Sequence, residues 1–141
     1  MKREQVCEIC ANISDMNGEE IGFLLEFALE KGAVDAWALP VLSRGKTPAY
    51  RLSVQCMKQD ATRMCELLLK HSTATAMTME MRHRIIMDEE MLYIETSYGM
   101  VRVAMAGGRQ RILHEDLVRL AQKHNMTLAE INEKLLEEMK A

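Results

Sequence analysis

The chain has 141 residues, of which 48% are hydrophobic, and a formal net charge of -3. A chain of this length is expected to form a single domain, residues 1–141, and to bury about 70% of its unfolded surface. The acidic balance argues against a nucleic-acid-binding protein, which is normally basic. No apolar run reaches the roughly 20 residues of a membrane helix, and no signal-peptide core follows the charged start. Four cysteines without framework spacing fit a reducing compartment, so we expect a cytoplasmic protein without membrane contact.

The first part of the chain alternates between strand and helix patterns. Hydrophobic residues at every second position predict strands over residues 6–13, 50–56 and 75–81, and a buried run predicts another over 33–42. Helical spacing predicts helices over residues 18–31 and 59–70, the first closed by Gly32. This β-α-β-β-α-β order is typical of a ferredoxin-like domain.

The remainder predicts two shorter strands, residues 91–96 and 100–105, and two helices, residues 114–124 and 128–139. Thr127 and Glu130 have the spacing of a capping box at the start of the last helix. The segment "AGGRQ", residues 106–110, is the best candidate for a linker. We therefore expect an α+β fold: a ferredoxin-like βαββαβ domain with an added β-hairpin and a C-terminal helical pair.

Two sulfur-containing patterns suggest metal or redox chemistry. Cys7 and Cys10 have CxxC spacing, but residues three apart in a strand point to opposite faces, which favours ordinary packing. Met77, Met79 and Met81 share one strand face, which suits a soft ion such as Cu(I) but equally suits a buried face. We favour the core interpretation for both patterns.

The bend after the first strand concentrates polar residues in a few positions. These are Asn12, Asp15, Asn17, Glu19 and Glu20. One interpretation is capping alone, with Asp15 or Asn17 as the N-cap and the two glutamates at the positive end of the helix. Asn12 lies before the bend, however, where a helix cap does not require it. The second interpretation is therefore a site for a cation and its ligand.

Such a site would use the chemistry of both the bend and the helix. Clustered Asn and Asp oxygens suit Mg²⁺ or Mn²⁺, usually shared with substrate phosphates. A helix that begins at Gly18 offers backbone N–H groups to an anion. The loop residues Arg44 and Lys46 supply positive charge that offsets phosphate. Both interpretations of the bend remain open from the residues alone.

A resemblance adds to this picture. The stretch "NISDMNGEEIG…LEKGAVDAWALPV" resembles the Asn-Ile-Asp-Asp-Met-(Thr/Asn)-Gly-Glu-Glu-Leu-Gly…Gly-Ala-Leu-Asp-Val…Pro-Ile pattern of the LarC family. The segments "YIETSYGMVRVAM" and "EDLVRLAQKHNMTLAEI" are similar to two later patterns of that family. The matches follow the family's order over nearly the whole chain and correspond to the C-terminal domain of LarC.

The resemblance implies a function in nickel-pincer nucleotide biosynthesis. LarC proteins are CTP-dependent nickel insertases, and their C-terminal domain is associated with binding Mn- or Mg-CTP and with oligomerisation. If the bend is such a site, we expect Asn12, Asp15 and Glu19 as metal ligands, and Gly18, Arg44 and Lys46 as nucleotide-binding residues. We expect a homo-oligomer, a trimer or larger, that acts with a separate nickel-binding LarC N-terminal-like protein. Nickel would reach the cofactor only through that partner, and no catalytic residue is assigned to this chain.

The chain departs from the family pattern at several positions. Ser14 replaces the first Asp of the family's Asp-Asp pair, Gly45 and Thr47 stand in the basic loop, and Thr78 stands where the family has Arg. Fewer cations and one fewer carboxylate predict weaker binding of a triphosphate. The alternative is a degenerate, non-catalytic ligand-binding or assembly module with the same fold.

Overall fold

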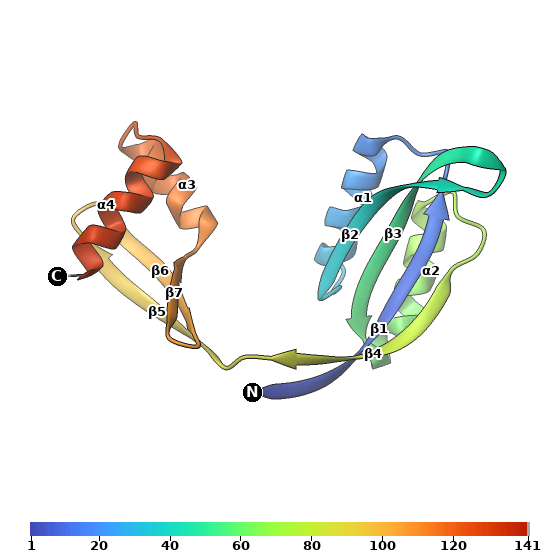
Figure 1. The fold of residues 1–141 in the computed structure, drawn as a ribbon, viewed down its shortest axis with the longest axis horizontal. Helices are drawn as coiled ribbons and strands as arrows, with labels where there is room; N and C mark the ends of the chain where they lie inside the picture. Colours follow the sequence, from blue (N-terminus) through green and yellow to red (C-terminus); the bar gives the residue numbers. More distant parts are fainter. Residues whose placement is uncertain (141) are drawn as a thin grey trace. The chain divides into compact units, whose positions relative to one another are not determined.

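The computed structural model describes residues 1–140, which form two compact units (Figure 1). Residues 3–85 form one unit, and residues 86–140 with residues 1–2 form the other. The prediction of a single domain stays a prediction. The elements that make up the first unit are β1 (Lys2–Ile13), α1 (Gly18–Glu30), β2 (Asp35–Ser43), β3 (Thr47–Met57), α2 (Ala61–His71) and β4 (Thr78–Ile86), with 3-10 turns at Arg44–Lys46 and Lys58–Asp60.

The first unit is a four-stranded sheet with the strand order β2-β3-β1-β4. Strand β3 runs antiparallel to both of its neighbours, β1 and β2. The two βαβ segments are thus interleaved, as the split arrangement requires. The expected ferredoxin-like order is confirmed, and β4 continues to Ile86, beyond its predicted end.

Alternation along β1 separates the two faces of this sheet. Its odd-numbered residues from Cys7 to Ile13 pack with residues of α1 and α2 in one buried core, so both helices cover the same face. Its even-numbered residues Glu8, Cys10 and Asn12 therefore lie on the opposite, open face. The predicted separation of Cys7 from Cys10 is confirmed. The sheet residues of this core are Cys7, Ile9, Ala11, Ile13, Leu52, Val54 and Cys56, and its helix residues are Ile21, Leu24, Ala28, Met64 and Leu68.

The second unit is a three-stranded antiparallel sheet with two helices. Its elements are β5 (Glu89–Thr96), β6 (Gly99–Ala106), β7 (Arg109–Ile112), α3 (His114–Lys123) and α4 (Leu128–Lys140). The predicted strand pair and helical pair are confirmed, but β7 is an additional strand. The linker proposed at residues 106–110 is wrong, because Gly107 and Gly108 form the tight β6–β7 turn. Their φ angles are 56° and 75°, the positive values that favour glycine in such turns.

The second unit has its own hydrophobic core. Val101 and Val103 of β6 pack against Leu120, Ile131 and Leu135 of the two helices, and all five are fully buried. The capping box predicted before α4 is confirmed: the Thr127 hydroxyl accepts from the Glu130 N–H at 3.1 Å, and the Glu130 carboxylate accepts from the Thr127 N–H at 3.3 Å. Within residues 1–140, no helix is long and apolar enough to span a membrane.

Candidate functional site

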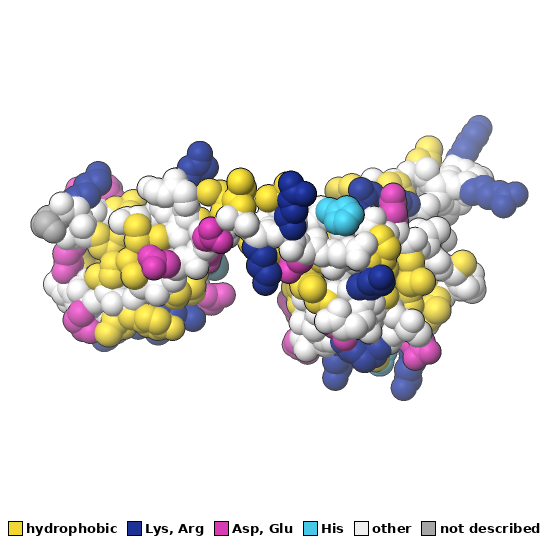
Figure 2. Space-filling model, turned by 90° about the horizontal axis from the view of Figure 1, so that it is seen from below, with side chains coloured by type: hydrophobic (Ala, Val, Ile, Leu, Met, Phe, Trp, Pro, Cys, Tyr) yellow, Lys and Arg dark blue, Asp and Glu magenta, His cyan; other side chains and the backbone are white. Residues whose placement is uncertain are grey.

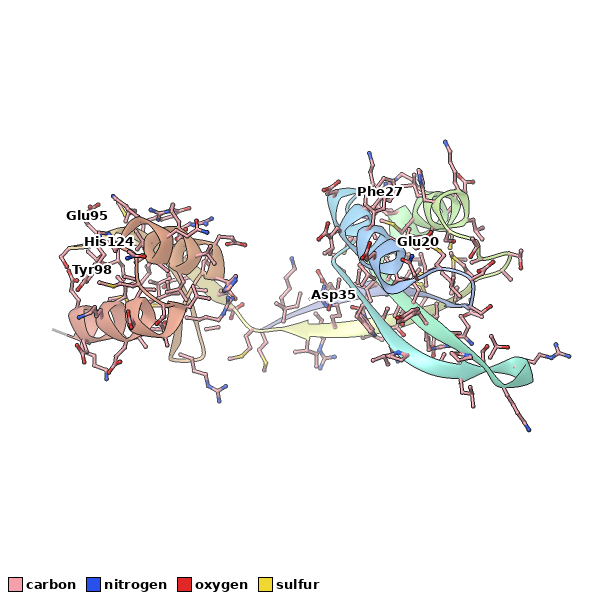
Figure 3. All side chains as sticks on the ribbon, turned by 90° about the horizontal axis from the view of Figure 1, so that it is seen from above. Glu20, Phe27, Asp35, Glu95, Tyr98 and His124 are labelled. Carbon is pink, nitrogen blue, oxygen red and sulfur yellow. The ribbon has the colours of Figure 1, made fainter. Side chains whose placement is uncertain are left out.

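The start of α1 is closed by a capping box between Asn17 and Glu20. The Asn17 side chain accepts from the Glu20 N–H at 2.8 Å, and the Glu20 carboxylate accepts from the Asn17 N–H at 3.1 Å. Figure 3 shows Glu20 on this first turn. The capping interpretation is thus confirmed for these two residues, and the N-cap is Asn17. It leaves Asn12, Asp15 and Glu19 without a role in the cap.

Asp15 and Glu19 face different surroundings. The Asp15 carboxylate accepts a hydrogen bond from the Thr73 hydroxyl, which ties the bend to the loop after α2. Glu19 is exposed on the first turn of α1, beside a shallow surface cavity of about 310 Å³. The other residues that line this cavity are Met16, Glu20, Phe23 and His71.

Asn12 lies on the open face of the sheet, at the end of β1. Its partner in the antiparallel pairing with β3 is Arg51, and both residues are exposed. Directly opposite residues in such a pair place their side chains on the same face, within about 5.5 Å at Cβ. Arg51 therefore brings a positive charge to Asn12. This pairing was not predicted, because the register between β1 and β3 cannot be read from local patterns.

A second cavity of about 160 Å³ lies between the end of β1 and the β2–β3 hairpin. Its polar contributions come from Ser14 and Tyr50, and the rest of its lining is Ile13, Met16, Pro40, Val41, Pro48 and Ala49. Tyr50 also approaches the start of α1 closely: a Cβ added at Gly18 would lie 3.3 Å from the Tyr50 hydroxyl oxygen. A glycine at this position lets the aromatic hydroxyl reach the helix N-terminus.

The N-terminus of α1 has backbone N–H groups beyond those that the cap and the first helical hydrogen bond use. The Glu20 N–H bonds to the Asn17 side chain and the Ile21 N–H bonds to the Asn17 carbonyl. The first N–H groups of a helix, here those of Gly18 and Glu19, have no partner within the helix. They form a small positive end beside the cavity that Ser14 and Tyr50 line.

Arg44 and Lys46 lie at the far end of the β2–β3 hairpin. The last residue pair between β1 and β3 is Ile13 with Tyr50, and the hairpin continues beyond it through the pairs Val41–Ala49, Leu42–Pro48 and Ser43–Thr47. At about 3.4 Å per residue, this overhang measures about 10 Å. Neither Arg44 nor Lys46 forms an ion pair or a side-chain hydrogen bond with residues 1–140. The hairpin is longer than the strand beside it, so these two charges extend past the bend.

The proposed metal ligands belong to three separate places: the open sheet face, the bend and the first turn of α1. Among residues 1–140, no group of three or more His, Cys, Asp or Glu side chains is arranged to hold a metal ion. The assignment of Asn12, Asp15 and Glu19 stays a prediction. If they bind a cation together, its phosphate ligand must supply part of the coordination.

The cysteines offer no alternative metal site in the described part of the chain. All four are free thiols, and Cys7, Cys10 and Cys56 are buried. Burial raises the pKa of Cys56 to about 11 and also raises the pKa of Cys7 and of Cys65. The thiolate is the form that binds metals and attacks disulfides. Because a raised pKa keeps these thiols protonated, they suit hydrophobic packing and not metal binding or redox chemistry.

Comparison with known protein families shows to which family this chain belongs. The family model described as "Nickel insertion protein" matches residues 1–132. The chain belongs to the nickel insertion protein family. The match includes the four-stranded sheet with its bend, the three-stranded sheet, α3 and the start of α4.

Curated members of the nickel insertion family are much longer than this chain. The pyridinium-3,5-bisthiocarboxylic acid mononucleotide nickel insertion protein of Alkaliphilus metalliredigens is 37% identical over 92 residues, which cover 65% of this chain and 22% of the relative. A putative nickel insertion protein of Enterococcus faecalis is 27% identical over 132 residues, covering 91% of this chain and 40% of the relative. The chain thus spans less than half the length of these relatives.

Solved structures identify which part of the nickel insertion proteins is similar. LarC2, described as the C-terminal domain of a cyclometallase involved in the synthesis of the NPN cofactor of lactate racemase, is 25% identical with a TM-score of 0.87. The match covers 99% of this chain and 100% of LarC2. A Methanopyrus kandleri protein, 13% identical with a TM-score of 0.55, covers 92% of this chain and 84% of its own, and shares the fold alone.

Two positions at which the chain departs from the LarC pattern take part in local structure. Ser14 lines the cavity next to Tyr50. The Thr78 hydroxyl donates to the Cys10 carbonyl at 3.5 Å, at the start of β4. Thr78 thus forms a backbone contact at a position where the LarC pattern has a cation.

Proposed function

We propose that the chain is the C-terminal, nucleotide-binding module of a nickel insertion system for the nickel-pincer nucleotide cofactor. The observation that carries this proposal is the match to the whole of LarC2 by a chain that spans less than half of its longer relatives. The nickel-handling part would then come from a separate N-terminal-like protein or domain. Nickel is cargo in this scheme and does not need a resident site here.

The nucleotide we propose is CTP with Mn²⁺ or Mg²⁺. The small cavity beside Ser14 and Tyr50 is mostly apolar and would take the base of the nucleotide. The free N–H groups of Gly18 and Glu19 would face the phosphates. Asn12, Asp15 and Glu19 would supply oxygen ligands to the cation that the phosphates share.

Positive charge would come first from Arg51, which is the cross-strand partner of Asn12. Arg44 and Lys46 would contribute at longer range from the hairpin end, where their distance and exposure weaken the attraction. Two or more charge-assisted contacts to phosphate would still fix the orientation of the nucleotide.

The second candidate is a non-catalytic ligand-binding or assembly module. The observations that favour it are the missing carboxylate at Ser14, the backbone contact of Thr78 in place of a cation, and the overhang of Arg44 and Lys46. A module of this kind would keep the fold and its core while binding nucleotide weakly or not at all.

Thermal unfolding with and without CTP and Mn²⁺ tests the nucleotide site. A ligand that binds only the folded state stabilises it by about 2.7 kcal/mol at a hundredfold excess over Kd. We expect the melting temperature to rise, the Asp15→Ala variant to lose that rise, and the Arg51→Ala variant to lose most of it. The exposed Arg109→Ala variant in the second unit is the matched control and should keep it. A flat titration with CTP, ATP and GTP at millimolar concentration refutes the nucleotide site and favours the second candidate.

Nickel transfer itself is tested by adding the chain to a purified nickel-binding LarC N-terminal-like protein with the thiocarboxylated mononucleotide. We expect nickel incorporation only when both proteins and CTP are present. Incorporation that proceeds equally well without this chain contradicts its role as a module of the system.

A further inference from the structure

Strand β4 forms an edge of the four-stranded sheet, with β1 as its one neighbour (Figure 1). An edge strand presents a row of backbone N–H and C=O groups that can pair with another strand. On the helix side of the sheet, β4 also exposes large apolar side chains: Met79 is 56% exposed, Met81 41% and Ile85 64%. Hydrophobic side chains are visible on the surface of both units in Figure 2.

The charged residues of β4 do not shield this edge. Arg82 donates to the Glu8 carboxylate at 3.0 Å and to the Glu80 carboxylate at 3.1 Å, and Arg84 donates to the Glu4 carboxylate at 3.0 Å. Glu4 and Glu8 belong to β1, so both arginines lean over the open face towards β1 rather than across the edge. Charged side chains are a usual protection of an edge strand, and here both arginines are already held in ion pairs with residues of β1.

We propose that β4 pairs antiparallel with β4 of a second copy of this chain, around a two-fold axis at Met81. In such a pair, the numbers of any two residues that lie opposite each other add up to the same value, here 162. Because this value is even, odd-numbered residues face odd-numbered residues, and the helices of both copies lie on the same face of the joined sheet. A centre at Met81 sets Glu80 opposite Arg82 of the partner subunit, and by symmetry Arg82 opposite the partner's Glu80. Two opposite-charge pairs thus flank the axis, and no like charges meet.

Neighbouring registers are less favourable. A centre at Glu80 sets that carboxylate opposite its own copy, and a centre at Arg82 does the same for the guanidinium. A centre at His83 sets Arg82 opposite Arg84 of the partner subunit. Like charges directly opposite each other destabilise a strand pair. Among the centres from residue 80 to residue 84, which pair at least five residues of β4, only the one at Met81 avoids such a contact.

The same register also matches the apolar face. Met81 lies opposite its own copy, and Met79 lies opposite His83 of the partner subunit. The two exposed methionines would thus be covered on the helix side while the backbone groups of residues 78–84 pair along the edge. Flexible thioether side chains adapt well to a surface of this kind.

Disulfide crosslinking tests the pairing and its register. In the full chain, Met81→Cys should form a crosslinked dimer under mild oxidation, because residue 81 faces itself across the axis. Met79→Cys is the matched control: its two copies lie about 14 Å apart along the strands, too far for a disulfide. Wild-type protein controls for the native thiols. Equal crosslinking of the two variants, or none with Met81→Cys, overturns the proposal.

A charge reversal supplies a test that does not depend on oxidation. Glu80→Arg creates two Arg–Arg pairs in the proposed register and should abolish association through β4, seen as a loss of mass by sedimentation velocity in a dilution series. Its intrachain pair with Arg82 is exposed and adds little to folding. Glu66→Arg, an equal charge change on the exposed surface of α2, should leave the mass unchanged. An unchanged mass for Glu80→Arg contradicts the proposal.

Discussion

Asp116 on the first turn of α3 holds both the backbone and the side chain of Arg102 on β6. One carboxylate oxygen accepts from the Arg102 N–H at 2.7 Å and from its Nε at 3.1 Å, and the other accepts from its terminal nitrogen at 2.9 Å. Asp116 is buried, while part of the guanidinium remains in contact with water. A single carboxylate therefore fixes where α3 begins relative to the sheet.

Asp116→Asn is expected to destabilise the second unit by about 2 kcal/mol, since hydrogen bonds to charged groups contribute about 1.5–3 kcal/mol. Urea unfolding followed by circular dichroism measures the change. Glu115→Gln is the matched control. That carboxylate is exposed and lies 3.6 Å from the same guanidinium, too far for a strong hydrogen bond, so its loss should change the unfolding free energy little. A loss below about 0.5 kcal/mol for Asp116→Asn means that the contact does not hold α3 in place.

The pH dependence of the same pair follows from its pKa shift. The hydrogen bonds from Arg102 lower the pKa of Asp116 below its usual value. The resulting stability is complete above the unfolded pKa of about 3.9 and is lost as the pH falls through the lower pKa of the folded state. The difference in unfolding free energy between wild type and Asp116→Asn should be constant from pH 7 to pH 5 and shrink below pH 4. A difference that grows in acid reverses the expected sign.

The cysteines are expected to be structural only. Cys7 and Cys10 lie on opposite faces of the sheet, and Cys7 is almost fully buried. Purified protein should therefore contain no stoichiometric zinc, and a chelator should leave its melting temperature unchanged. Native Cys7 and Cys56 should react with iodoacetamide much more slowly than after unfolding, because burial raises their pKa. Zinc that is lost together with folding in Cys7→Ser would disprove this interpretation.

Two variants of the bend separate its structural role from the proposed binding role. Asn17→Ala removes the N-cap and should cost about 1 kcal/mol of unfolding free energy, while the stabilisation by CTP and Mn²⁺ persists. Asp15→Ala should instead remove the CTP effect, with a smaller change in basal stability because its bond to Thr73 is exposed. Chemical unfolding with and without CTP gives both values. If both variants bind CTP as wild type does, Asp15 is not a ligand.

Much of the fold was predictable because its signals are local. Alternation from Cys7 to Ile13 reports which residues of β1 face the helices, and helical spacing around Leu24 reports the buried side of α1. Strand β7 escaped prediction because its four residues, Arg109–Ile112, include one buried side chain and show no alternation. The glycines before it resemble a linker as much as a turn until the pairing of β6 with β7 is known.

The candidate site was less predictable because it depends on pairing between distant segments. The cap of α1 is a local motif, and the sequence narrowed its N-cap to Asp15 or Asn17, of which the structure shows Asn17. Arg51 became a candidate only through its register with Asn12, which no local pattern encodes. The length of the β2–β3 hairpin beyond β1, which carries Arg44 and Lys46 away from the bend, is likewise a property of three strands together.

The capping box at Asn17 and Glu20 also bears on how the bend can change during evolution. Because the chain itself completes the cap, the orientation of α1 owes nothing to a bound nucleotide. A ligand that arrives at this helix end meets donors that are already aligned, so association need not wait for a slow refolding step. Equally, a substitution at a bend residue outside the cap, such as position 14, leaves these two hydrogen bonds intact. Residues that would bind a ligand at this bend can therefore change without disturbing the residues that cap the helix.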